Sequence, residues 1–335
     1  MKKKTTVIMT AALAAAMMTA GVSAEDYKVG IIKFVDDASL DQIENSIKAR
    51  LDELSGEGED KFIYDGYVIN GQADATVISQ AATQLLSDGV QVIIPIATPA
   101  AQIVQTLTAD QAEPTPVVFS AVSDPVGAGL VESLEAPGAN ITGTSDALNT
   151  ASVLDLMFAA NPEISSVGLL YSQSEDSSKQ PIADAKAYLD EKGVSYVEKT
   201  GTNNTEIMQA ADALAAAGVN AVFTPTDNTV MTAELAIYET LIEAGIPHYC
   251  GADSFALNGA FCGYGVDYSV LGTETANIAV EILKGASPAE TPVGTFDNGI
   301  ATVNTETAEA LGLDYSSFVE HATEVKEIQT AESFE

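Results

Sequence analysis

The chain has 335 residues, 46% of them hydrophobic, which predicts a folded protein of two lobes rather than one modest core or a disordered acidic tail. Its net charge of −34, from 48 acidic residues against 14 lysines and arginines, disfavours nucleic acid and anionic lipid headgroups as partners. The simplest interpretation of this charge is solubility in a salty or crowded exterior.

The first 24 residues have the organisation of a secretion signal. Lys2, Lys3 and Lys4 precede an apolar stretch at 7–20, and small residues at 22–24 form a cleavage site. The apolar stretch is shorter than the ~20 residues that a membrane-spanning helix needs. We therefore expect an exported, soluble protein in the periplasm or at the cell surface.

Beyond this segment, short apolar runs alternate with segments of helical periodicity. Strands are predicted at 28–35, 62–70, 90–96, 116–121, 140–144, 166–171, 195–199, 221–225, 247–251 and 260–266. Helices are predicted at 39–55, 75–88, 99–108, 148–161, 180–192, 205–217, 228–244 and 271–284. This alternation predicts an α/β fold with parallel sheets and helices on both faces.

One strand-to-helix corner occurs twice. The segment 89–98, GVQVIIPIAT, lines up with 218–227, GVNAVFTPTD, and 28–32 lines up with 166–170. The sequence thus predicts two copies of one α/β unit. Because ligands bind at the carboxyl ends of strands in open α/β sheets, two such edges facing each other predict a cleft.

The first corner has the features of an anion site. Thr98 is suited to cap a helix, and Pro99 is suited to its first position. Ala100 and Ala101 follow, and their small side chains leave the backbone N–H groups accessible at the positive end of the helix dipole. A ligand carboxylate is expected here, with a plain helix cap as the alternative.

Aspartates follow several other predicted strands. Each is by itself more often a cap or a turn former than a ligand contact. Together they would place several carboxylates at the cleft, where a cation or an ammonium group binds well. An anion site beside acids suits a zwitterionic amino acid. These aspartates are Asp124, Asp146, Asp227, which precedes Asn228, and Asp253.

The two cysteines, Cys250 and Cys262, lie on neighbouring predicted strands. An even count in an exported protein favours a disulfide, with two buried thiols as the alternative. His248 and His321 lack metal-ligand spacing, so no metal site is expected. No cofactor motif or nucleophile-base pair occurs. We expect neither a cofactor nor an enzyme, and an exported cleft enzyme such as a hydrolase is the alternative.

Nearly the whole exported part resembles the substrate-binding proteins of ABC transporters related to the tryptophan- and other aromatic-amino-acid-binding proteins. The resemblance rests on the block from PVVFSAVSDPVGAGLV to GTSD at 116–146 and on PTDNTV at 225–230. VGIIKFVDDASLD at 29–41 and GYGVDYSVLGTETANIAVEILKGASP at 263–288 support it. It implies a type I periplasmic-binding-protein fold, whose two lobes are joined by three crossovers, close on a small solute and pass it to a membrane permease.

The resemblance also implies roles for individual residues. A hydroxyl and N–H groups of the first lobe would hold the ligand carboxylate, and an acid of the second lobe would hold its ammonium group. Relatives commonly have glutamine and His-Pro where this chain has Lys33 and Asp37-Ala38, so aromatic specificity is not implied. The predicted ligand-binding residues are Thr98, Ala100, Ala101, Ser120, Asp146, Asp227, Asn228, Asp253 and Asn70.

We therefore predict a monomeric solute-binding protein that closes on an amino acid by a hinge motion and works with an ABC permease. Lobe one is expected to comprise 25–145 and 268–297, and lobe two 146–267 and 298–335. The secretion signal disfavours a third class, the effector domain of a transcriptional regulator.

Overall fold

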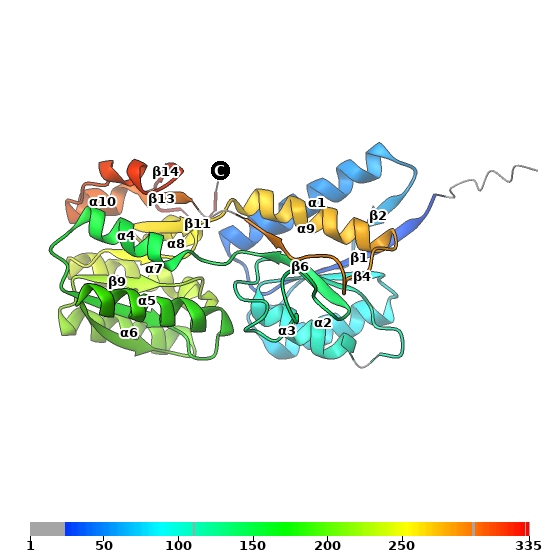
Figure 1. Ribbon diagram of the computed structural model, residues 1–335, viewed down its shortest axis with the longest axis horizontal. Coiled ribbons are helices and arrows are strands. Elements are labelled where there is room, and N and C mark those ends of the chain that lie inside the picture. Colours follow the sequence, from blue (N-terminus) through cyan, green and yellow to red (C-terminus); the bar gives the residue numbers. More distant parts are fainter. Residues whose placement is uncertain (1–23, 110, 297–298, 332, 335) are drawn as a thin grey trace, which may run out of the picture.

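The computed structural model describes residues 24–109, 111–296, 299–331 and 333–334. Figure 1 shows two lobes side by side, each containing a sheet and helices. Apart from its last residue, the predicted signal peptide at 1–24 lies outside the described residues. Within the described part of the chain, every helix is too short or too polar to span a bilayer.

The first lobe is built on a parallel sheet of order β12-β6-β5-β4-β1-β2, in which β3 also pairs with β1. Helices α1 and α9 pack together on one face, and α2 and α3 cover the other (Figure 1). The strands are β1 (Asp26–Lys33), β2 (Lys61–Ile63), β3 (Val68–Asn70), β4 (Val92–Ile96), β5 (Val117–Phe119), β6 (Ile141–Ser145) and β12 (Gly294–Thr295). The helices are α1 (Ala38–Glu57), α2 (Ala75–Ser87), α3 (Thr98–Ala109) and α9 (Tyr268–Leu283).

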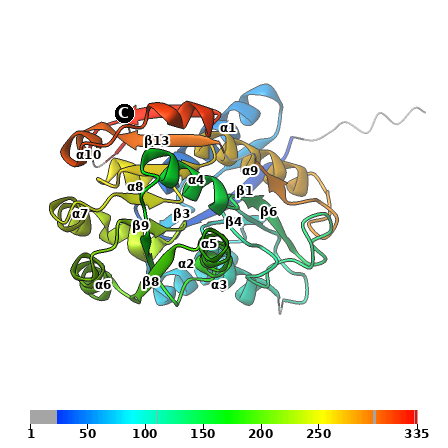
Figure 2. The same cartoon turned by 60° about the vertical axis from the view of Figure 1, so that its left-hand side comes forward.

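The second lobe repeats this plan with the order β14-β13-β11-β10-β9-β7-β8, in which only the β11–β13 pair is antiparallel among the described strands. Figure 2 brings this lobe forward and shows α6 and α7 together at one side. The strands are β7 (Ser166–Tyr171), β8 (Ser195–Thr200), β9 (Ala221–Thr224), β10 (His248–Cys250), β11 (Cys262–Gly265), β13 (Ile300–Asn304) and β14 (Glu324–Ile328). The helices are α4 (Thr150–Ala160), α5 (Lys179–Lys192), α6 (Asn204–Ala217), α7 (Asn228–Glu243), α8 (Asp253–Leu257) and α10 (Thr305–Leu311), with 3-10 turns η1 (Asp176–Ser178) and η2 (Ser316–Glu320).

The chain passes between the sheets three times: after β6, after β11, and between β12 and β13. The predicted α/β architecture of two similar lobes joined by three crossovers is confirmed. The lobe boundaries proposed from the sequence stay a prediction, and the last of them, between 297 and 298, lies outside the described residues.

Two differences from the predicted elements have local causes. The strand predicted at 62–70 is interrupted between β2 and β3, where Gly66 has a φ of +84° and turns the chain. The strands after residue 284 and the short helices α8 and α10 were not predicted. Strand β14, EVKEI, lies at the edge of its sheet and contains no fully buried residue, so it lacks the apolar run that marks the inner strands.

The predicted disulfide between Cys250 and Cys262 is wrong, because both thiols are free and buried. In the parallel β10–β11 pair, Tyr249 lies opposite Cys262, and Cys250 lies opposite Gly263. Since successive strand residues point to opposite faces of a sheet, the two sulfur atoms lie on different faces. Cys250 packs in the core beneath α7 and α8, whereas Cys262 packs with Tyr249 in the core beneath α4 and α5.

Candidate ligand-binding site

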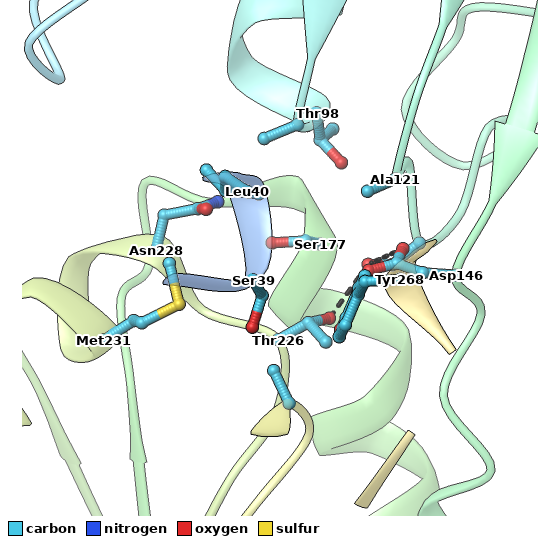
Figure 3. Close-up of a pocket in the computed structure, with 13 residues that line it drawn as sticks. Ser39, Leu40, Thr98, Ala121, Asp146, Ser177, Thr226, Asn228, Met231 and Tyr268 are labelled. Atoms are coloured by element: carbon cyan, nitrogen blue, oxygen red, sulfur yellow. Dashed lines mark hydrogen bonds between the residues drawn. The ribbon is translucent and has the colours of Figure 1, made fainter. Parts of the chain in front are cut away.

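A cavity lies between the lobes at the carboxyl ends of the strands of both sheets. Its volume is about 20 Å³, room for about one water molecule, so the two lobes are tightly closed around it. Figure 3 shows the side chains around it. The first lobe contributes Ser39, Leu40, Ala97, Thr98, Ala121 and Ser123, the second contributes Ser177, Thr226, Asn228, Met231 and Ala252, and Asp146 and Tyr268 lie next to two of the crossovers.

Of the nine residues predicted to bind a ligand, the structure brings three to the cavity wall: Thr98, Asp146 and Asn228. Ala100 and Ala101 are fully buried in the first turn of α3, directly behind this wall. Whether any of these residues touches a ligand stays a prediction.

The other four predicted residues are engaged elsewhere. The hydroxyl of Ser120 shares a hydrogen bond with that of Thr275 at 2.8 Å, inside the first lobe. Asn70, the last residue of β3, accepts a bond at Oδ1 from the N–H of Gln72 at 2.7 Å and does not line the cavity. Asp227 caps helix α7, and Asp253 accepts hydrogen bonds from the first lobe. A position at a strand end therefore did not by itself place a side chain in the cavity.

Helix α3 begins directly after β4 and presents its N-terminus to the cavity. Thr98 is its first residue rather than a cap preceding it, so the capping role predicted from the sequence is not observed. Among the described residues, no side chain accepts a hydrogen bond from the first N–H groups of α3. The positive end of this helix is therefore available to a negatively charged ligand group.

Two alanines on the same wall have left-handed backbone conformations. Ala97, at the end of β4, has a φ of +81°, and Ala121, just after β5, has a φ of +53°. Such a conformation costs a non-glycine residue on the order of 1 kcal/mol, so the surrounding structure holds both turns in place. Both alanines line the cavity. Backbone strain therefore lies at the first-lobe wall of the site.

Helix α7 has the equivalent position in the second lobe, but its N-terminus is occupied by two carboxylates. Asp227 Oδ1 accepts a bond from the N–H of Val230 at 3.0 Å. Glu175 accepts bonds from the N–H groups of Asn228 at 3.2 Å and Thr229 at 2.8 Å, and from both of their side chains. Burial, and then the charge of Glu175, raise the pKa of Asp227 to about 7. This helix end is closed to an external anion.

Asp146 is the charged side chain in the cavity wall. It follows β6, is 6% exposed and accepts a hydrogen bond from Ser123 Oγ at 2.9 Å. Ser123 Oγ in turn lies 2.8 Å from Thr226 Oγ1 of the second lobe. Burial raises the pKa of Asp146 to about 6, against the lowering effect of the Ser123 bond. With no basic residue in the wall, this carboxylate offers a site for a ligand cation.

Most residues of the cavity wall were not predicted from the sequence. Ser39 and Leu40 lie in VGIIKFVDDASLD and Tyr268 lies in GYGVDYS, two segments that carried the family resemblance. These segments therefore contained the signal, but the residues predicted from the sequence were those at strand ends and at the helix starts that follow them. Tyr268 is buried, and its pKa is raised well above its usual value by burial and by nearby acids, so its phenol stays neutral.

Side chains of the two lobes form hydrogen bonds with each other at two places, so the cleft is closed. Ser39 Oγ on α1 donates to Asp253 Oδ1 on α8 at 2.5 Å. Gln102 Nε2 on α3 donates to Asp176 Oδ2 in the second lobe at 2.8 Å. Among the described residues, no group of three or more histidine, cysteine or acidic side chains is arranged to hold a metal ion.

A family model described as ABC transporter substrate binding protein matches residues 28–326. A tyrosine-binding protein of Clostridioides difficile (strain R20291) is 30% identical over 311 residues, which cover 93% of this chain and 87% of that protein. These matches span nearly the whole described structure.

Two solved structures allow the closed arrangement to be compared. An ABC domain from Streptococcus pneumonia in complex with L-Trp is 31% identical, with a TM-score of 0.82 and coverage of 90% of this chain and 99% of that one. The ligand-free, open structure of a substrate-binding protein with adhesive properties from Clostridium difficile is also 31% identical, with a TM-score of 0.67 and coverage of 91% and 100%. At equal identity, the better match to the ligand-bound structure agrees with the closed cleft.

Proposed function

Because the chain belongs to the family of ABC transporter substrate-binding proteins, we propose that it binds an aromatic amino acid, tyrosine or tryptophan, in the interlobe cavity. The tyrosine-binding relative and the tryptophan complex support this ligand class. Members of the family are extracytoplasmic and work with an ABC permease. For this chain, we further propose a monomer in the periplasm or at the cell surface that releases its ligand unchanged.

The observation that carries the proposal is a difference between the two helix N-termini near the cavity: carboxylates of the protein occupy one of them and not the other. The end of α3 is open, and Thr98 adds a hydroxyl beside it, so it suits the ligand carboxylate. The end of α7 is occupied by Asp227 and Glu175, so it repels a carboxylate. Asp146 lies on the same cavity and suits the ammonium group. The amino acid is thereby held in one orientation.

The rest of the wall combines apolar side chains with uncharged polar ones, so it suits an uncharged ligand side chain. Leu40 and Met231 contribute the larger apolar surfaces, and Ala121 and Ala252 the smaller ones. Because the closed cavity has a volume of only about 20 Å³, an aromatic ring enters when the lobes separate. Met231 is flexible and polarizable, and a methionine adapts well to an aromatic ring. The neutral phenol of Tyr268 is available as a polar contact.

Thermal unfolding and calorimetry with a matched ligand set test this function. L-Tyrosine and L-tryptophan are expected to stabilise the protein, by about 2.7 kcal/mol at a ligand concentration 100 times the Kd. N-acetyl-L-tyrosine lacks the ammonium group and L-tyrosine methyl ester lacks the carboxylate, so both are expected to bind weakly. Tighter binding of a sugar or a nucleoside would overturn the amino-acid assignment, and chemical change of the bound amino acid would support the enzyme alternative.

A further inference from the structure

Asp253, predicted from the sequence to contact the ligand, instead joins the two lobes. It lies at the start of α8 in the second lobe, and its carboxylate accepts bonds from two α1 side chains of the first lobe: Ser39 Oγ at 2.5 Å and Gln42 Nε2 at 3.1 Å. The N–H of Ser254 also donates to Ser39 Oγ, at 3.2 Å. These bonds cross the lobe interface, so they form only while the cleft is closed.

A second carboxylate lies on the other side of Ser39. Asp37 caps α1 by accepting bonds from the N–H groups of Ser39 at 2.8 Å and Leu40 at 3.2 Å, and it is 8% exposed. Two carboxylates from different lobes therefore contact the same residue. The hydrogen-bond donors to both carboxylates are neutral groups. Closure therefore brings two negative charges close together where they are shielded from water.

Nearby cations do not neutralise this pair. Lys33, on β1, is held in ion pairs with Asp36, Asp41 and Glu44. The exposed Lys326 on β14 favours the ionised form of Asp253, but it forms no ion pair with it within the described residues. The closed interface thus has an excess of negative charge.

The pKa values of both groups follow from this environment. Burial, followed by the charge of Asp253, raises the pKa of Asp37 to about 7, against the lowering effect of its backbone bonds. Burial also raises the pKa of Asp253, more than the bonds from Ser39 and Gln42 lower it. When the lobes separate, both carboxyls meet water, where an aspartate has a pKa of about 4.

We propose that closure of the lobes takes up one proton from solvent at the Asp37–Asp253 pair, so that mild acid favours the closed protein even without ligand. Protonation of either carboxylate leaves one charge where two faced each other. The ratio of closed to open protein is then largest below pH ~4, falls as the pH rises, and becomes constant above about pH 7.

Other acids near the cleft contribute little in this range. Asp146 has a pKa of about 6 in the closed cavity, so it contributes mainly below that pH. The hydrogen bonds of Asp227 go to Ser172, Ser178 and Val230, all in the second lobe, so separation of the lobes is not expected to break them. The window from pH 8 to pH 6 therefore reports chiefly on Asp37 and Asp253.

Spin-label distances across the cleft test this proposal without any ligand. Thr83→Cys on α2 and Gln209→Cys on α6 introduce labelling sites at exposed positions of the two lobes, while the native cysteines are buried. From pH 8 to pH 6, the closed-to-open ratio is expected to rise about tenfold in the parent. In the Asp37→Asn, Asp253→Asn double variant it is expected to rise no more than about twofold, through Asp146.

A matched control removes two exposed acids, Glu113→Gln and Asp190→Asn, and is expected to behave like the parent. Asparagine is a good N-cap, so the double variant keeps the start of α1. The single variant Asp253→Asn leaves that cap unaltered and is expected to show a smaller rise than the parent. A constant ratio in the parent, or an unchanged rise in the double variant, would overturn the proposal. Since no ligand is used, failure of the ligand assignment leaves this result unaffected.

Discussion

The corners at 89–98 and 218–227 begin from the same sequence pattern and differ in what fills the helix N-terminus. In the first, Thr98 stands where the second has Asp227, and no described side chain caps α3. In the second, Asp227 and Glu175 saturate the start of α7. One helix end can therefore receive an anion while the other cannot. Two copies of one α/β unit can therefore bind a ligand in a single orientation, because carboxylates of the protein fill the helix N-terminus of one copy only.

The backbone before each helix differs in the same way. Ala97 has a φ of +81°, whereas its counterpart Thr226 does not belong to the positive-φ residues of the described chain. Both line the cavity. Of the two corners, only the one with the open helix end is therefore strained, and such strain is often found at binding sites.

The largest expected effect comes from the cavity acid beside these corners. Asp146→Asn preserves size but removes the charge opposite the ligand ammonium, and it is expected to weaken binding of L-tyrosine by about 2 to 5 kcal/mol in calorimetry. Asp124→Asn is the matched control, because Asp124 accepts a hydrogen bond from the Gly127 N–H in the first lobe and lies off the cavity wall. Equal affinities of the two variants would remove Asp146 from the ligand site.

Asp146 also predicts a pH dependence. A bound ammonium group favours the ionised carboxylate, and the pKa of the empty site is about 6. This contribution to affinity is present above pH 6 and is lost as the pH falls through that value. Calorimetric titrations of the parent and of Asp146→Asn at pH 7 and pH 5 measure this contribution. The difference in affinity between the two proteins is expected to be smaller at pH 5 than at pH 7.

The open corner itself is tested by Thr98→Ala. Loss of a hydroxyl that contacts a charged carboxylate is expected to cost about 1.5 to 3 kcal/mol in binding. Stability toward urea should fall by no more than about 1 kcal/mol, because the buried hydroxyl caps no helix. Thr106→Ala, on the outer side of α3, is the control. A large loss of stability with unchanged affinity would show that Thr98 acts as a cap after all.

At the corner before α7, a substitution is expected to lower stability more than affinity, the reverse of Thr98→Ala. Glu175→Gln replaces one acceptor oxygen by an amide and weakens the contacts to Asn228 and Thr229, so it is expected to destabilise the protein by about 1 to 2 kcal/mol in urea unfolding. Affinity for L-tyrosine should change less than in Thr98→Ala. If Glu175→Gln lowers affinity more than Thr98→Ala, the carboxylate site has been assigned to the wrong helix.

The smallest effect is expected at the strained alanine. Ala97→Gly relieves the left-handed conformation but increases the entropy of the unfolded chain, so the free energy of unfolding should change by less than about 1 kcal/mol. Ala97→Val, with a β-branched side chain in the same conformation, should be clearly less stable. Thermal melts of the two variants compare them, and equal stability would argue against strain at this position.

Much of the fold followed from local patterns. Runs such as VQVIIPI and AVFTP predicted inner strands because a strand covered on both faces must be apolar throughout. Edge strand β14 was missed because it is half solvated. The candidate site was predicted only in part: Thr98, Asp146 and Asn228 reached the cavity, while Asp227 and Asp253 did not. A strand end specifies the edge of a sheet but leaves open whether a side chain faces a ligand, a helix end or the other lobe.

The sequence by itself determined the two α/β units, their repeated corners and the family, because these depend on residue periodicity and on motifs of fixed spacing. The tertiary structure decided which contacts the polar side chains make. The strand register separated Cys250 from Cys262 by placing them on opposite faces. The fold brought Glu175 to the start of α7, 53 residues away in the chain, and Asp253 to Ser39 across 214 residues. Such pairings arise only when distant segments pack together, and no local pattern encodes them.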